Sequence, residues 1–311
     1  MRGCMYYPIL RGKLNEFLAL RELASLSLQN HFCPVIEPVR EDLSALRRAV
    51  LELNTNNIKP LIIINPVIGE FKGQFSNITD SLNHGSDLQY IPCFILHDSI
   101  DGVPSEVKAL GEYALFVTRG IDQQVIQESK EAVLTFVNHD ISPNVLILLK
   151  NVVLCGDFFR SQLRNADYPE ESSFSALHTY YNKPYQNLVV GFSDYTITGQ
   201  DFSESGGPAY VVTIHVSYID PKRFNEMFIR HYLSYEDGTP AQPGAKFLSA
   251  LQLLIKDIET GSVPFVKTTA LSEFITLNIK RHFPGLGQVK KICIKHHIET
   301  LIDYLNNEKG S

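Results

Sequence analysis

The strongest constraint on the fold of this chain is a series of eight short apolar segments punctuated by Gly, Pro or Asn. They span residues 6–10, 33–39, 60–66, 90–96, 113–118, 133–137, 152–156 and 187–192. Most are continuously apolar, which is typical of strands that are covered on both faces. Amphipathic stretches such as NEFLALRELASL and DLSALRRAVLEL separate them and carry apolar residues at helical spacing.

This alternation of strand and helix predicts a parallel sheet. Eight strands are the number that a closed (β/α)8 barrel requires. Two segments are ambiguous, because residues 133–137 could continue the preceding helix and residues 144–149 could form a strand instead of a helix. A doubly wound open sheet is therefore the alternative fold. Neither GxGxxG nor GxxxxGK[ST] follows the first strand, which argues against a nucleotide-binding Rossmann or P-loop protein.

The pattern changes after the eighth segment. Residues 209–218 and 227–235 alternate apolar and polar side chains, which predicts an antiparallel hairpin with one solvated face. Helices are expected near residues 245–260, 268–282 and 288–306. We therefore predict the α/β class, with a (β/α)8 TIM-like barrel over residues 1–200. A C-terminal β-hairpin and helical appendage over residues 201–309 would pack on the barrel as part of a single structural unit.

The composition limits the cellular location and the classes of binding partner that we expect. The 311 residues carry a formal net charge of -6, which argues against bulk nucleic-acid binding. Five single cysteines without a CxxC pair are typical of buried thiols in a reducing cytoplasm. The first residues contain no secretory h-region, and no apolar stretch approaches the ~20 residues of a membrane helix. We expect a cytoplasmic protein without membrane contact.

Polar side chains follow every predicted strand, at the end where an α/β barrel places its chemistry. In chain order they are Arg11 and Lys13, Glu37, Asn65, His97 and Asp98, Arg119, Asn138 to Asp140, Asp157, and Asp194. Loops are polar in any protein, so several of these positions are expected by chance. The pattern therefore locates a candidate site without naming its substrate.

Three of these positions carry more weight than the others. Glu37 lies inside the apolar segment PVIEPV, where a buried carboxylate is costly unless it is paired or bound. Lys13 or Arg11 on the neighbouring strand could be its partner. A functional role for Glu37 and a purely structural ion pair are equally good interpretations. Asn65 could likewise belong to a functional site, or its side chain could cap a turn before proline. Asp194, followed by Tyr195, favours a functional role.

The hairpin adds a second group of candidates. His215 lies on an alternating strand, where a structural histidine is the simpler interpretation. Arg230 and His231 lie on the next strand and could face the same cleft as Asp194. The Gly206–Pro208 turn before the hairpin would then act as a lid.

These residue types favour acid–base chemistry on an anionic ligand, because Arg and Lys suit phosphates and carboxylates and carboxylates serve as general acids or bases. The predicted catalytic residues are Glu37, Asp194, His215 and Lys13. The predicted substrate-binding residues are Arg11, Asn65, Arg119, Tyr195, Arg230 and His231. The reaction hypothesis is a hydrolase or transferase acting on a phosphorylated, carboxylated or nucleotide-like substrate.

No residue is assigned as a metal ligand, and the cofactor is unknown. His97 and Asp98 could bind a divalent metal together with Asp157 and Asp194. That interpretation is the minority one, because HExxH, HxH and DxD spacings are absent. The serine-hydrolase motif GxSxG is also absent, since VGFSD lacks the second glycine.

Several segments resemble a family of uncharacterised bacterial proteins related to the phage beta-protein family. They are MYYPILRGKLNEFLALREL, PVIEPVRE, INPVIGEF, RNADYPEE, VGFSDYTITG and HFPGLGQVKKICIKHH. The resemblance covers nearly the whole chain. The matching positions are Tyr7, Lys13, Glu16, Glu37, Asn65, Arg164, Asn165, Asp167, Asp194, Tyr195, His215, His231, His296 and His297.

The resemblance implies a TIM-barrel architecture and a setting in phage defence, because members are often encoded beside a small nuclease-like protein. It implies no established reaction. Two main hypotheses remain: an enzyme with its site at the barrel mouth, or a non-catalytic ligand-sensing or scaffold component that holds the partner. A weaker third is nucleic-acid binding through the basic segment that contains Lys290, Lys291 and Lys295.

Overall fold

The computed structural model describes residues 5–28, 30–71, 75–83, 88–100, 102–180, 188–202, 207 and 209–308. The chain divides into two compact units. The first contains Met1–Asp157 and Leu177–Tyr195, and the second contains Phe158–Ala176 and Thr196–Ser311. The chain thus leaves the first unit after Asp157, returns to it at Leu177, and leaves it again after Tyr195. The expected boundary at residue 200 lies close to the last of these crossings.

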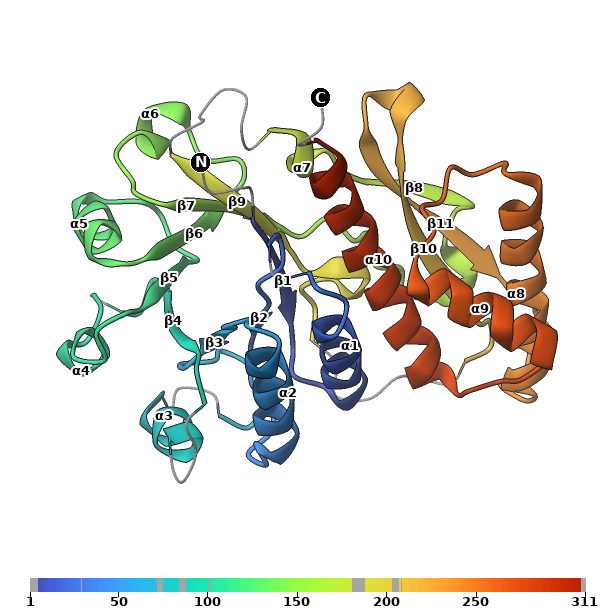
Figure 1. Cartoon of the computed structure of the whole chain (residues 1–311), viewed down its shortest axis with the longest axis horizontal. Helices are drawn as coiled ribbons and strands as arrows, with labels where there is room; N and C mark the ends of the chain where they lie inside the picture. The colour runs from blue at the N-terminus through green and yellow to red at the C-terminus, as the bar shows by residue number, and fades with distance from the viewer. Residues whose placement is uncertain are drawn as a thin grey trace. The chain divides into compact units, whose positions relative to one another are not determined.

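The first unit is a closed barrel of eight parallel strands in the described part of the chain, in the order β1-β2-β3-β4-β5-β6-β7-β9 (Figure 1). The strands are β1 (Met5–Leu10), β2 (Val35–Ile36), β3 (Leu61–Ile63), β4 (Ile91–Leu96), β5 (Ala114–Val117), β6 (Leu134–Asn138), β7 (Val152–Gly156) and β9 (Val189–Asp194). Each overlaps one of the eight apolar segments, and strand β9 pairs with β1 to close the ring. The predicted TIM-like barrel is confirmed.

Helices connect the strands and lie outside the ring (Figure 1). They are α1 (Leu14–Ala24), α2 (Ser44–Thr55), α3 (Phe75–Asn83), α4 (Ser105–Lys108), α5 (Gln123–Glu131), α6 (Pro143–Leu146) and α7 (Leu177–Tyr180). Residues 133–137 form most of strand β6, and residues 144–149 contain the end of helix α6, which settles the two ambiguous segments.

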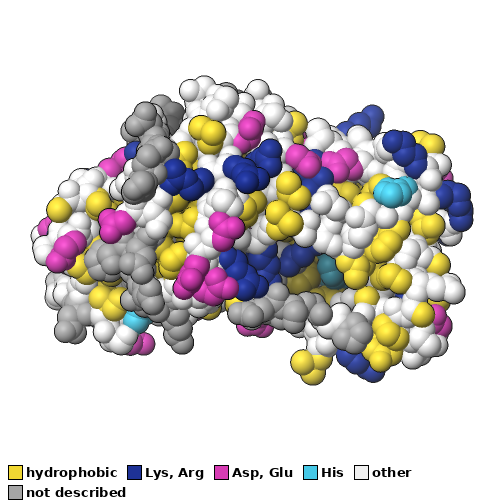
Figure 2. Space-filling view, turned by 90° about the horizontal axis from the view of Figure 1, so that it is seen from below, with side chains coloured by type: hydrophobic (Ala, Val, Ile, Leu, Met, Phe, Trp, Pro, Cys, Tyr) yellow, Lys and Arg dark blue, Asp and Glu magenta, His cyan; other side chains and the backbone are white. Residues whose placement is uncertain are grey.

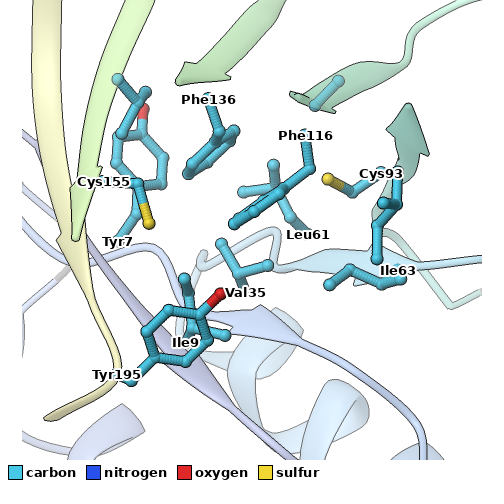
Figure 3. Close-up of a cluster of buried hydrophobic side chains, with 13 residues drawn as sticks. Tyr7, Ile9, Val35, Leu61, Ile63, Cys93, Phe116, Phe136, Cys155 and Tyr195 are labelled. Carbon is cyan, nitrogen blue, oxygen red and sulfur yellow. The ribbon is translucent and has the colours of Figure 1, made fainter. Parts of the chain in front are cut away.

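Alternate residues of the barrel strands point inward and build one apolar cluster, which includes Tyr7, Ile9, Val35, Phe116 and Phe136 (Figure 3). The residues between them are buried as well, on the opposite side of the strands. Burial on both sides explains why the strand segments are continuously apolar. A TIM barrel is filled by side chains in this way and is not a pore.

The second unit contains an antiparallel sheet that has three strands among the described residues, in the order β10-β11-β8. Strands β10 (Thr213–Asp220) and β11 (Glu226–Leu233) are the predicted hairpin. Strand β8 (Glu171–Ser175) pairs with β11 and was not predicted from the sequence. Short 3-10 helices lie at η1 (Asn165–Asp167), η2 (Thr196–Thr198) and η3 (Pro221–Arg223).

The three C-terminal helices are also as predicted: α8 (Pro243–Thr260), α9 (Thr269–Lys280) and α10 (Leu286–Glu308). Helix α8 packs on the sheet face that carries Tyr232, whose hydroxyl donates to Asp257 at 2.8 Å. Helix α10 contacts the opposite face through Ser217, whose Oγ lies 2.7 Å from His297 Nδ1. The expectation of one solvated sheet face is therefore wrong, because helices cover both faces.

Candidate active site at the barrel mouth

The first strand reaches the mouth of the barrel through a tight turn, Arg11-Gly12-Lys13, that leads directly into helix α1. Gly12 has a φ of +65°, in the left-handed region that other residues rarely adopt. A Cβ at this position would lie 3.2 Å from the carbonyl oxygen of Glu37. The turn thereby brings the first two strand ends close together. Lys13 precedes the first residue of α1, and its backbone N–H lies 3.4 Å from Glu16 Oε2.

Arg11 and Glu37 form an ion pair at this turn, with Arg11 Nη1 donating to Glu37 Oε2. Both are buried, with 8% of Arg11 and 1% of Glu37 exposed to solvent. The other carboxylate oxygen, Glu37 Oε1, accepts from the backbone N–H of Val67 at 3.1 Å. Burial raises the pKa of Glu37, and the charge of Arg11 together with both hydrogen bonds opposes this rise.

Tyr195 forms the aromatic side of this group. The Arg11 guanidinium lies over its ring, 4.8 Å from the centroid, in a cation–π geometry. Tyr195 belongs to the interior cluster and lies beside Ile9 and Val35, with its hydroxyl directed toward the other side chains of the cluster (Figure 3). Burial raises the pKa of Tyr195, so its hydroxyl stays neutral across the physiological range. The structure thus brings together one polar group over the barrel core, which consists of Arg11, Glu37 and Tyr195.

The strand register places Asp194 on the other side of the barrel wall. Tyr7 and Ser193 are paired across β1 and β9 and point into the barrel. The pairs on either side of them point the opposite way, and these are Pro8 with Asp194 and Tyr6 with Phe192. Tyr6, which is fully buried, donates its hydroxyl to Asp194 Oδ1 at 2.7 Å. The burial of this pair and the carboxylate together raise the pKa of Tyr6. The register thus sets Asp194 and Tyr195, its neighbour in the sequence, on opposite sides of the strand.

Two other predicted binding residues have structural partners. The side-chain amide of Asn65 donates to the carbonyl of Ile95 at 2.8 Å and accepts from its N–H at 2.7 Å. Asn65 thus ties its strand end to β4 two residues beyond the last backbone pair, Ile63 and Cys93. Arg119 donates to the carbonyl of Ile100 at 3.0 Å and contacts Asp122, the residue that caps helix α5. These contacts hold Arg119 in the loop that leads into α5.

The remaining predicted site residues lie in the second unit. His215 on β10 faces His231 on β11, with their Nδ1 atoms 2.7 Å apart. Arg230 points to the other face of the same sheet, where it forms ion pairs with Glu170 and Asp257. The two histidines are therefore brought together, and Arg230 is separated from them by the sheet. The lid expected at Gly206–Pro208 lies mostly outside the described residues.

The other residues singled out from the sequence lie in several different parts of the structure. His296 and His297 are completely buried within helix α10. Arg164 and Asp167 form an exposed ion pair with each other. His97 is half-buried, and Asp98 and Asp157 are exposed. In the part of the chain that the structure describes, no three His, Cys, Asp or Glu side chains gather closely enough to hold a metal ion.

Sequence reasoning missed three residues that surround His215 and His231. They are Phe159, Tyr168 and Ser172, which all come from the chain segment that joins the second unit before strand β9. Their segment has no apolar run, so nothing in the sequence pattern indicates that it packs against the hairpin. The motif RNADYPEE was the available signal, since it places Tyr168 and Glu170 just before strand β8 and Glu171 at its first position.

Charged side chains of both signs are interspersed over the face shown in Figure 2. The formal net charge of -6 argues against bulk nucleic-acid binding. Within the described ranges, no helix has the length and apolar character needed to cross a bilayer.

No protein-family model and no curated protein matches this sequence. The resemblance to the phage beta-protein family therefore stays a prediction that rests on the quoted segments alone.

Proposed function

We propose that the protein is an enzyme that binds an anionic substrate at the C-terminal face of its barrel. The observation that carries this proposal is the buried Arg11–Glu37 pair over the barrel core. Removing two charges from water costs several kcal/mol per ion and is often not repaid in stability. A pair that ends two neighbouring barrel strands, where TIM-barrel enzymes hold their catalytic groups, is better accounted for by function.

Each side chain has a role in this proposal. Arg11 provides the cationic donor for a phosphate or carboxylate, and Lys13 at the start of α1 adds a second positive charge. Glu37 acts as the general base or acid, because burial shifts its pKa upward toward the range in which proton transfer is efficient. Tyr195 supports the guanidinium from its ring face. The substrate is a phosphorylated, carboxylated or nucleotide-like molecule, and the reaction is a hydrolysis or group transfer.

The test separates binding from turnover. Glu37→Gln keeps the shape of the side chain and an oxygen that can accept from Arg11. We expect it to bind the substrate normally and to lose turnover by at least about 100-fold. Binding is measured by calorimetry with a panel of phosphate, pyrophosphate, citrate and mononucleotides. Turnover is measured as release of phosphate or of the hydrolysed product from each ligand that binds.

Arg11→Met combined with Glu37→Gln removes both charges together and avoids leaving one of them unpaired. It is expected to abolish binding. Arg119→Met is the matched control, because it removes an arginine from another strand end, where its side chain contacts the Ile100 carbonyl and Asp122. Unchanged anion binding in the double variant, or normal turnover in Glu37→Gln, would refute the barrel-mouth site.

A non-catalytic ligand-sensing or scaffold role is the alternative, and one observation favours it. Both oxygens of Glu37 already accept hydrogen bonds from the protein, from Arg11 and from Val67, as in a structural ion pair. Under this alternative, ligands bind at Arg11 but no product forms with the unaltered protein. The same panel therefore distinguishes the two functions.

We extend the proposal, on the strength of the quoted resemblance, to a cytoplasmic role in phage defence with a nuclease-like partner protein. The extension is tested by plating phage on cells that carry the gene with its neighbours. Plating should rise when Glu37→Gln replaces the natural residue. Equal plating with and without the gene would count against the defence role and leave the barrel-mouth chemistry unaffected.

A further inference from the structure

The second unit contains a hydrogen-bonded chain of three side chains on one face of its sheet. Ser172 Oγ on strand β8 lies 2.8 Å from His231 Nε2 on β11. His231 Nδ1 lies 2.7 Å from His215 Nδ1 on β10. One residue from each of the three strands therefore contributes to a continuous line from a hydroxyl, through one imidazole, to a second imidazole.

The hydrogen-bonding capacity of the groups allows two distributions of protons along this line, one the reverse of the other, and the first of them suits catalysis. A neutral imidazole has one donor and one acceptor nitrogen. If Ser172 donates to His231 Nε2, then His231 Nδ1 carries the proton and donates to His215 Nδ1, and each contact has one donor and one acceptor. In this arrangement the base is hydrogen-bonded to the nucleophile and is oriented by a third group, which is the relation that defines a nucleophilic triad on unrelated folds.

Aromatic rings hold the two imidazoles in place. Tyr168 stacks on His231 with centroids 4.8 Å apart and an interplanar angle of 27°. Phe159 meets His215 edge to face at 5.2 Å. Burial lowers the pKa of His231 to about 4 and also lowers the pKa of His215 well below its ordinary value, so both rings are neutral at physiological pH. A neutral His231 can accept a proton, while Ser172 remains half-buried on the edge strand of the sheet.

We propose that the second unit carries a serine acyl-transfer site in which Ser172 is the nucleophile and His231 is its general base. His215 is a positioning residue that fixes the tautomer and the orientation of His231. The substrate class is an activated acyl compound, an ester or thioester. The site is distinct from the barrel-mouth residues and does not depend on the function proposed for them.

The chemistry balances in two steps. Ser172 Oγ forms a bond to the acyl carbon and its proton passes to His231 Nε2, which then protonates the leaving alcohol or thiol as the bond to it breaks. Water then attacks the acyl-serine, gives one proton to His231, and releases the carboxylic acid as His231 returns the proton to Ser172 Oγ. No metal or redox partner takes part in either step.

The test uses the full-length protein and a biotinylated fluorophosphonate, which forms a stable bond only with an activated serine. Intact mass and peptide mapping should show a single adduct on Ser172. Ser172→Ala should remove that adduct. Ser173→Ala is the matched control, because Ser173 is the next residue on the same strand, points to the other face and donates to Glu226. It should label like the unaltered protein.

Two variants of His215 test its positioning role, with the rate of adduct formation as the readout. His215→Asn keeps an acceptor for His231 Nδ1–H and should retain most of the rate, whereas His215→Leu should lose at least about tenfold. The pH at which labelling reaches half its maximum should also shift in His215→Leu. The titratable group that acts on the His231 ring is Glu171 on β8, and those that act on the His215 ring are His231 on β11 and Lys290 on α10.

Three outcomes would overturn the proposal: no adduct on Ser172 when a known serine hydrolase labels fully, equal labelling of Ser172→Ala, or unchanged labelling of His231→Gln. Circular dichroism of each variant verifies that it is folded. Labelling of Ser172 and turnover of the anion panel are separate readouts, so failure of this site and failure of the barrel-mouth site give different results.

Discussion

At the scale of single residues, the buried Arg11–Glu37 pair determines how much a substitution at the barrel mouth destabilises the protein. Removing only one charge leaves the other buried without its counter-ion, which typically costs about 3–5 kcal/mol. We therefore expect Arg11→Leu to lower the free energy of unfolding by that amount. Arg11→Leu with Glu37→Met should recover most of the loss, because neither charge remains. Urea denaturation of both variants provides the measurement. If the free energy of unfolding of Arg11→Leu lies within about 1 kcal/mol of that of the natural protein, the prediction is wrong.

A second prediction at this scale concerns His296. Its Nε2 lies 2.8 Å from the carbonyl of Ser217 and so carries the proton, while Nδ1 accepts from the Thr268 hydroxyl at 2.8 Å. Burial lowers the pKa of His296 to about 4, below its ordinary value of 6.5. Its contribution to stability is therefore present above pH 6.5 and is lost as the pH falls toward 4.

Between pH 7 and pH 5 this single histidine should remove roughly 2 kcal/mol of the free energy of unfolding. The measurement is urea denaturation at the two pH values. His296→Gln should show a smaller difference between the two values, because glutamine does not titrate. Equal pH dependence in both proteins would show that His296 is not responsible.

The candidate site shows how far single residues could be predicted from the sequence. Glu37 could be singled out, because a carboxylate inside an apolar strand has few interpretations, and Arg11 was one of its two expected partners. Asp194 could not be placed on one side of the barrel wall. Side chains alternate across a strand, but β9 is buried on both sides, so no polar face reveals which of Asp194 and Tyr195 points inward.

At the scale of elements, the closure of the barrel depends on the seam between β1 and β9. Gly191 lies opposite Met5 in this seam, and a Cβ there would come within 2.2 Å of the Met5 carbonyl oxygen. The contact is with backbone, which cannot move without opening the seam. Gly191→Ala is therefore expected to destabilise the protein by about 2 kcal/mol or more.

Gly120→Ala is the control for this prediction, since nothing lies within 4 Å of a Cβ at that position. The urea midpoints of the two variants are compared at an unchanged slope. If Gly191→Ala and Gly120→Ala have the same midpoint, then the seam is wide enough for a methyl group and the barrel closes less tightly than the structure shows.

The elements themselves were largely predictable because barrel strands and amphipathic helices have strong periodic signals. Strand β8 was not, since ESSFS contains three serines and one aromatic residue and has no apolar run. It is a strand because β11 supplies backbone partners and Phe174 packs against His297 on helix α10. Such tertiary stabilisation leaves no signature in the local sequence.

At the scale of the whole molecule, the chain crosses between its two units more than once, so the second unit is not a simple C-terminal segment. Residues 158–176 supply strand β8, the edge partner of β11, together with the aromatic rings that pack on His215 and His231. A fragment of residues 196–311 would lack all of these contacts. The edge of β11 that pairs with β8 would be exposed, which favours aggregation.

We therefore expect the fragment of residues 196–311 to be poorly ordered and prone to aggregate. Adding a synthetic peptide of residues 158–176 should restore cooperative unfolding and protect the amides of β11 from hydrogen exchange. A peptide with Phe174→Ser and Tyr168→Ser is the control, because it keeps the backbone partners of β11 and loses the aromatic packing. Cooperative unfolding of the fragment without any peptide would mean that the sheet forms independently of β8, and the second unit would then fold from its C-terminal segment alone.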